Sequence, residues 1–225
     1  MKRMIVESLQ GITLAGGGPF GASLLRKALE FAPRLVAADG GADRALRLGA
    51  EPEAVIGDLD SIGAAARARL SDRLYPIAEQ EMTDFDKALR SISAPFVLGI
   101  GFVGARTDHG LAVLNALVRH AHRRCLILGP RDISFIAPLS LDLALPLGSV
   151  LSLFPLGPVR GTSSGLRWPI DGLSFASDAM IGTSNLVTGP VSLRFDAAKM
   201  LVIVPIRSLG AVLDGLQLRL PALGE

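Results

Sequence analysis

Several residue types are scarce in this chain of 225 residues, and each scarcity excludes a class of protein. The single cysteine, Cys125, excludes an internal disulfide and a zinc site built from cysteines. Aromatic residues make up only 5%, with one Trp and one Tyr, so the core must be mainly aliphatic. No stretch of about 18 apolar residues is free of Gly, Pro and charge, so no membrane-spanning helix is expected.

The charge is also nearly balanced, with 23 Lys and Arg against 21 Asp and Glu. This balance argues against a nucleic-acid-binding protein with a broad basic surface. The first residues, MKRMIVESLQ, carry charge but no apolar segment follows them, so they do not read as a signal peptide. Hydrophobic residues reach 49%, which is ample for a core. We therefore expect a globular cytoplasmic protein that binds neither nucleic acid nor membrane.

Short apolar segments that end in Gly or Asp alternate with helical segments over the first part of the chain. The apolar segments are GITLAGGG, RLVAADGG, AVIGDLDS, PFVLGIG and CLILGP. Apolar residues at three- and four-residue spacing mark the helices between them, as at Leu24, Leu25 and Ala28. This alternation predicts an α/β domain with a doubly wound, mostly parallel sheet. Ligands of such sheets lie at the carboxyl ends of the strands, where Gly and Asp collect here.

The pattern changes near Pro130 to Pro138. Segments such as SVLSLFPL, VSLRFD and KMLVIVPI are short, rich in strand-forming residues and separated by Gly, Pro, Ser and Asp. They predict an all-β, sandwich-like domain. We therefore expect an α/β domain over residues 1–132 and a β domain over residues 133–225.

Two carboxylates follow one predicted strand, in the segment AVIGDLDSI. Asp58 and Asp60, at i and i+2, point to the same side if the backbone stays extended. Mg²⁺ takes carboxylate oxygens as ligands together with waters and phosphate oxygens. A single Asp here would more often cap a turn or the next helix. A pair at the carboxyl end of a parallel strand favours a metal site.

The segment QEMTDFDKAL contains a predicted helix start. Thr83 and Asp86 resemble a capping box, in which Asp86 satisfies backbone donors. Asp84 has no such structural role and can project beside Asp58 and Asp60. Lys87 falls in the first turn, where the helix dipole disfavours it. It is either solvated or reaches a phosphate.

Two further segments allow both structural and functional interpretations. Gly99, Gly101 and Gly104 spell G-x-G-x-x-G, but no acidic residue follows at the distance a dinucleotide site needs. We interpret them as a loop that exposes backbone to phosphate, followed by Arg106. Asp108 is either the N-cap of the next helix or a site residue. In GTSSGLRWPI, composition alone favours a core position for the lone Trp, although an exposed Trp can stack on a cationic ring.

Taken together, these segments resemble the thiamin pyrophosphokinase family. They occur in the family's order: AADGGAD, GDLDSI, Q-x-x-T-D, G-x-R-T-D-H, SLFPL, GLRWPI and the Ser-Asn of GTSN. The resemblance runs from about Leu14 to Pro205. One departure is Ala105, where the family often has Gly. No role is assigned to Gly16, Gly17 and Gly18.

The resemblance implies an ATP- and Mg²⁺-dependent homodimer that moves a diphosphoryl group to thiamin, with thiamin held in a cleft between subunits. Three carboxylates would be catalytic and hold the metal, namely Asp58, Asp60 and Asp84. The nucleotide and its phosphates would contact Asp39, Gly40, Gly41, Lys87 and Arg106. Thiamin would contact Gln80, Asp108, Trp168, Ser184 and Asn185.

Two alternatives remain open at this point. One is a Mg²⁺-dependent phosphohydrolase in which Asp58 of D-x-D is the nucleophile. The other is a non-catalytic regulator that binds thiamin or a nucleotide on the same fold.

Overall fold

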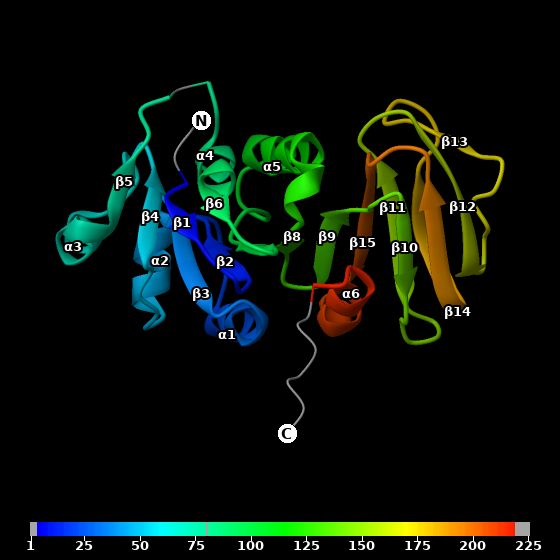
Figure 1. Cartoon of the computed structure of the whole chain (residues 1–225), viewed down its shortest axis with the longest axis horizontal. Coiled ribbons are helices and arrows are strands. Elements are labelled where there is room, and N and C mark those ends of the chain that lie inside the picture. Colours follow the sequence, from blue (N-terminus) through cyan, green and yellow to red (C-terminus); the bar gives the residue numbers. More distant parts are fainter. Residues whose placement is uncertain (1–3, 80, 219–225) are drawn as a thin grey trace. The chain divides into compact units, whose positions relative to one another are not determined.

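The computed structural model describes residues 4–79 and 81–218 of the chain. It divides into two compact units between Pro130 and Arg131 (Figure 1). The boundary that we expected, after residue 132, lies just beyond this division. None of the helices within the described ranges is long and apolar enough to cross a membrane.

The first unit is built on a parallel sheet of six strands in the order β5-β4-β3-β2-β7-β8. The strands are β2 (Ile12–Ala15), β3 (Arg34–Ala38), β4 (Ala54–Gly57), β5 (Leu74–Pro76), β7 (Val97–Ile100) and β8 (Cys125–Leu128). Every residue of β2, β4, β7 and β8 is buried, which explains why these strands appear as almost entirely apolar runs. The predicted doubly wound parallel sheet is confirmed.

Helices connect these strands. They are α1 (Ala22–Phe31), α2 (Gly41–Arg47), α3 (Ala64–Arg69), α4 (Asp84–Ser91) and α5 (Thr107–Arg119), with short 3₁₀ turns η1 (Ser71–Arg73) and η2 (Ala121–Arg123). Helix α1 contacts β7, α2 contacts β2 and β3, and α4 contacts β3 and β4. The short strands β1 (Val6–Glu7) and β6 (Ile92–Ser93) pair in parallel as a separate sheet.

The strand order reverses at β2. The chain builds β3, β4 and β5 on one side of β2, then returns to add β7 and β8 on the other. In an open α/β sheet such a reversal leaves a crevice at the carboxyl ends of the two strands beside it. Here the crevice is bordered by the loops after β2 and β7, which are joined by hydrogen bonds from Gly16 N to Ile100 O (2.8 Å) and from Gly18 N to Gly101 O (2.9 Å).

The second unit is rich in β structure, as expected, and its strands pair mainly in antiparallel fashion. Its strands are β9 (Asp132–Ile136), β10 (Ser140–Leu143), β11 (Val150–Pro155), β12 (Val159–Leu166), β13 (Ser174–Phe175), β14 (Gly182–Phe195) and β15 (Met200–Pro205). The long β14 pairs with β11 through its first part and with β10 and β12 through its second. Strand β15 pairs with β11 and β9. A 3₁₀ turn, η3 (Ile206–Ser208), and helix α6 (Leu209–Gly215) follow.

Candidate active site

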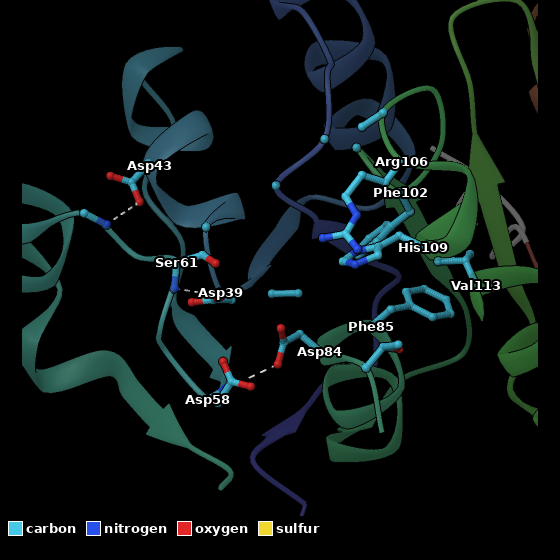
Figure 2. A pocket seen from close by; sticks show the side chains of 18 of the residues that line it. Asp39, Asp43, Asp58, Ser61, Asp84, Phe85, Phe102, Arg106, His109 and Val113 are labelled. Atoms are coloured by element: carbon cyan, nitrogen blue, oxygen red, sulfur yellow. Dashed lines mark hydrogen bonds between the residues drawn. The ribbon is translucent and has the colours of Figure 1, made fainter. Parts of the chain in front are cut away.

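An open pocket of about 780 Å³ lies at the carboxyl ends of the parallel strands, at the crevice beside β2. Acidic side chains from the ends of β3 and β4 and from the start of α4 form one side. The other side is formed by Arg106, just before α5, by His109 of α5 and by the rings of Phe85 and Phe102, as Figure 2 shows. The predicted collection of Gly and Asp residues at the strand ends therefore borders a real cavity.

Three carboxylates at this edge lie close enough to share one cation. Asp39, Asp58 and Asp60 each place an oxygen within 4.8 Å of the others. The reason that we gave for the Asp58–Asp60 pair was wrong, because the backbone between them is not extended. Leu59 has a φ of 64°, and Asp60 N donates a hydrogen bond to Asp58 Oδ1 (3.4 Å). A tight turn, rather than the alternation of a strand, brings the two carboxylates together.

Asp39 is the most buried member of this cluster, with 4% of its surface exposed. Its Oδ2 accepts a hydrogen bond from Ser61 N (3.1 Å), whereas its Oδ1 is buried and has no hydrogen-bond partner among the described residues. Burial raises the pKa of Asp39 to about 6, against the lowering effect of the Ser61 hydrogen bond. A buried carboxylate oxygen without a partner is costly, and a bound cation would remove that cost.

Asp84 stands beside this cluster at the start of α4. Thr83 is the N-cap of α4, as predicted, and its hydroxyl accepts from Asp86 N (3.4 Å). Asp84 Oδ1 accepts hydrogen bonds from Asp58 N (3.3 Å) and from Lys87 Nζ (3.1 Å). Gly57 permits this approach, because a Cβ there would lie 3.0 Å from Asp84 Oδ1. Asp84 is thus adjacent to the three-carboxylate cluster, which it reaches through Asp58.

The position of Lys87 differs from both expectations for it, a solvated side chain and a contact with phosphate. Only 1% of its side chain is exposed, and it does not line the pocket. Its ammonium donates to Asp58 Oδ2 (2.9 Å) and to Asp84 Oδ1 (3.1 Å). Neither a solvated Lys nor a direct phosphate contact describes this position. Burial alone would lower the pKa of Lys87, but these two hydrogen bonds outweigh burial and raise it.

The glycines at this edge allow backbone segments to approach closely. A Cβ on Gly41 would overlap the carbonyl oxygen of Ala15, and one on Gly18 would lie 2.6 Å from Gly101 O. Gly101, with a φ of 73°, also requires the left-handed region. Gly17, Gly18 and Gly40 line the pocket. The N-terminal glycines therefore help to form the loop edge of the crevice, which the sequence alone did not reveal.

Arg106 and Asp108 flank the pocket at the start of α5. The N-cap of α5 is Arg106 and not Asp108, which lies in the first turn. Arg106 Nη2 lies 2.6 Å from Asp108 Oδ2, and the hydrogen bond from Arg106 lowers the pKa of Asp108 to about 2. Both side chains are exposed. Arg106 lines the pocket, whereas Asp108 faces Arg106 outside it.

The second unit brings three of the expected thiamin residues together. Trp168 N donates to Asn185 Oδ1 (3.1 Å), and Asn185 Nδ2 donates to Trp168 O (2.6 Å). Ser184, next to Asn185, has a φ of 61° and donates its N–H to Ser152 Oγ (2.9 Å). Trp168 is 53% exposed, so the core position favoured by composition is wrong. The fifth expected residue, Gln80, lies outside the described residues.

Several pocket residues besides Arg106 were not identified from the sequence. His109 and Val113 line the pocket and follow Arg106, the N-cap of α5, at spacings of three and four residues, so that they lie on the same side as Arg106. That spacing was the available signal for His109 and Val113. Phe85 and Phe102 pack edge to face with ring centroids 4.7 Å apart. No pattern in the sequence around either residue indicates this contact.

Comparisons with known proteins match one family model to each of the two units. The catalytic-domain model of thiamin pyrophosphokinase matches residues 25–128, and the vitamin B1 binding domain model matches residues 139–200. Thiamine pyrophosphokinase 1 of Oryza sativa subsp. japonica is 28% identical over 70% of this chain and 75% of its own length. Thiamine pyrophosphokinase 1 of Arabidopsis thaliana is 27% identical over 70% and 72%.

Solved structures show the same fold at lower identity. Thiamin pyrophosphokinase from Geobacillus thermodenitrificans superposes with a TM-score of 0.70 at 21% identity, over 87% of this chain and 96% of its own. The enzyme from Candida albicans gives a TM-score of 0.71 at 14% identity, over 89% and 91%. The two family models together span most of the sequence, and the chain therefore belongs to the thiamin pyrophosphokinase family.

Proposed function

We propose that this chain transfers the diphosphoryl group of ATP to the hydroxyethyl oxygen of thiamin, giving thiamin diphosphate and AMP. The observation that carries the proposal is the acidic wall of Asp39, Asp58 and Asp84 beside the pocket of the catalytic-domain region. In this reaction an alcohol attacks a phosphorus atom. The enzyme therefore needs in-line positioning and charge neutralisation more than covalent chemistry.

The three-carboxylate cluster at this wall fits Mg²⁺. Asp39, Asp58 and Asp60 offer clustered carboxylate oxygens, and the buried Asp39 Oδ1 has no hydrogen-bond partner among the described residues. Bound there, Mg²⁺ would neutralise charge on the phosphate oxygens. Asp84, which the resemblance also assigns to the metal, stands next to this set through Asp58. We assign the thiamin hydroxyl proton to Asp58 or Asp84, the two carboxylates that share Lys87.

The basic residues have separate tasks in this proposal. Lys87 holds Asp58 and Asp84 in place, because its ammonium is buried against both. Arg106 binds phosphate oxygens from the opposite side of the pocket. Its exposed pair with Asp108 is weak and can be exchanged for a phosphate at little cost. Asp39 and the Gly40–Gly41 turn adjoin the nucleotide.

Thiamin would be bound by the second unit. The half-exposed ring of Trp168 suits a flat, cationic thiazolium or a pyrimidine ring, and the Arg167 guanidinium already lies over it, 5.1 Å from its centroid. Asn185 holds the Trp168 backbone through two hydrogen bonds. We propose that Gln80 and Asp108 line the thiamin site. Trp168, Ser184 and Asn185 would contact the same thiamin from the partner subunit of a homodimer. We also infer that the enzyme is cytoplasmic.

The test is a product assay. Purified protein with ATP, Mg²⁺ and thiamin should form AMP and thiamin diphosphate in equal amounts. Asp58→Asn, which keeps the shape of the side chain but removes its charge, should lower turnover by orders of magnitude. No AMP, or AMP formed equally well without thiamin, would refute the proposal. Covalent phosphate on Asp58 would favour the phosphohydrolase, and thiamin binding without turnover would favour the regulator.

A further inference from the structure

A second carboxylate, behind the pocket, is surrounded by basic side chains. Asp86 is 3% exposed and lies in the first turn of α4. Its Oδ2 accepts a hydrogen bond from Arg119 Nη1 (2.9 Å), and its Oδ1 lies 3.0 Å from Arg90 Nε and 3.3 Å from His120 Nε2. Two of these three partners come from the end of α5 and the residue after it, more than thirty positions along the chain.

This arrangement differs from the capping role that we expected for Asp86. Its backbone N–H is the group that Thr83 caps, while its carboxylate points toward the end of α5. The same segment holds the other end of α4, because Arg123 Nη1 donates to the carbonyl oxygens of Leu89 (3.3 Å) and Ile92 (2.7 Å). The end of α5 and the turn after it therefore hold α4 at both of its ends.

Both helices supply residues to the pocket. Asp84 and Phe85 of α4 line one part of it, and His109 and Val113 of α5 line another. Asp86 lies between Asp84 and Lys87 in the sequence, so a shift of the first turn of α4 moves both. The contacts of Asp86 with Arg119 and His120 thus connect the helix that carries Asp84 to helix α5.

We propose that Asp86 is a positioning residue, which fixes the first turn of α4 against α5 and so sets where Asp84 and Lys87 stand. The inference rests on the proposed function. Asp86 touches neither substrate nor metal in this proposal and acts only through its neighbours. A displacement of about 1 Å at a reacting group can cost roughly 100-fold in rate, so a loosened α4 should reduce turnover.

The variant Asp86→Asn tests this role in a folded protein. It keeps the side-chain shape and removes the charge. Arg90 retains its ion pair with Glu79 (2.9 Å), and Arg119 is 42% exposed and can be hydrated, so neither arginine is left buried and unpaired. We expect kcat to fall about 10- to 100-fold, with the KM for thiamin within about threefold of the parent value, because the proposed thiamin residues are untouched.

A matched control separates positioning from general destabilisation. Thr13 is fully buried in β2, and its hydroxyl donates to Ala32 O (2.7 Å) away from α4 and α5. Thr13→Val should lower the melting temperature and leave kcat within about twofold once both variants are assayed well below melting. Arg119→Gln should reproduce part of the Asp86→Asn loss, and the double variant should lose no more than Asp86→Asn alone.

Amide hydrogen exchange gives a readout that does not require activity. Exchange in Asp86→Asn should accelerate at the first turn of α4 more than in Thr13→Val at equal loss of melting temperature. Unchanged kcat, a rise in KM alone, or exchange that is uniform across the unit would overturn the positioning role. An inactive parent protein would refute the proposed function instead, and the exchange result would then decide the positioning role.

Discussion

Replacing Lys87 by Met is the most direct test of how the acidic wall is held. The substitution keeps most of the buried aliphatic stem but removes the ammonium from between Asp58 and Asp84. Two neighbouring carboxylates then lose their shared cation. Lys87 does not line the pocket, so the first effect should be on stability rather than on ATP affinity.

The expected loss follows from burial. Removing one partner of a fully buried ion pair costs about 3–5 kcal/mol, because the other charge stays buried and unpaired. Here the two carboxylates are 19% and 30% exposed, so water can solvate part of the orphaned charge. We therefore expect Lys87→Met to lower the free energy of unfolding by about 2–4 kcal/mol at pH 7 without metal.

The pH dependence of this loss has a defined sign. The hydrogen bond from Lys87 lowers the pKa of Asp58 against the opposing effect of burial. Its stabilising contribution is present above the unfolded pKa of about 3.9 and is lost as pH falls through the folded value. The raised pKa of Lys87 gives a contribution that is lost only as pH rises above about 10.4. The difference in the free energy of unfolding between the parent and Lys87→Met, here called the stability gap, should therefore be constant between about pH 5 and 9.

Urea unfolding followed by circular dichroism, in buffer with a metal chelator, measures this gap. Arg69→Met is the matched control, because Arg69 pairs with Glu51 on the exposed surface and its loss should cost less than about 1 kcal/mol. A gap for Lys87→Met no larger than that of the control would refute the reasoning. Weaker ATP binding with unchanged stability would instead return Lys87 to a phosphate contact.

Two other substitutions test the remaining assignments. Asp39→Asn should raise metal-free stability at pH 7 by up to about 3 kcal/mol, because the pKa of Asp39 is raised to about 6 and its charged form is penalised. The gain in stability should grow between about pH 4 and 6, and the stabilisation of the protein by added Mg²⁺ should be lost. Thermal melts with and without Mg²⁺ measure both effects. If Mg²⁺ stabilised the variant as much as the parent, Asp39 would not belong to the metal ligands. Trp168→Ala should raise the KM for thiamin without lowering the melting temperature, since the ring is 53% exposed, whereas a protein that unfolds would place Trp168 in the core.

Local patterns were sufficient for much of the fold. The runs ending in Ala15, Ala38, Gly57 and Ile100 are parallel strands, because a strand buried on both faces is predominantly apolar. The N-cap at Thr83 was likewise predictable, since a cap depends on residues three positions apart. The strand β5 was missed, because its exposed Tyr75 and Pro76 leave no apolar run.

The site was predicted less completely. Asp58 and Asp60 were identified as a pair, but the left-handed backbone at Leu59 was not. Asp39 joins them because β3 and β4 are neighbours in the sheet, with Ala38 opposite Ile56. Nothing close to Asp39 in the sequence reports that pairing.

By itself the sequence determined the two-part organisation, the parallel and antiparallel strands and the acidic residues at the strand ends. The tertiary structure alone decided that Lys87 is buried between Asp58 and Asp84, that Asp86 binds the end of α5, and that Trp168 is exposed. The physical reason is the range of the interactions. Caps, turns and periodicity depend on residues a few positions apart, whereas burial and ion pairing depend on segments that only packing brings together.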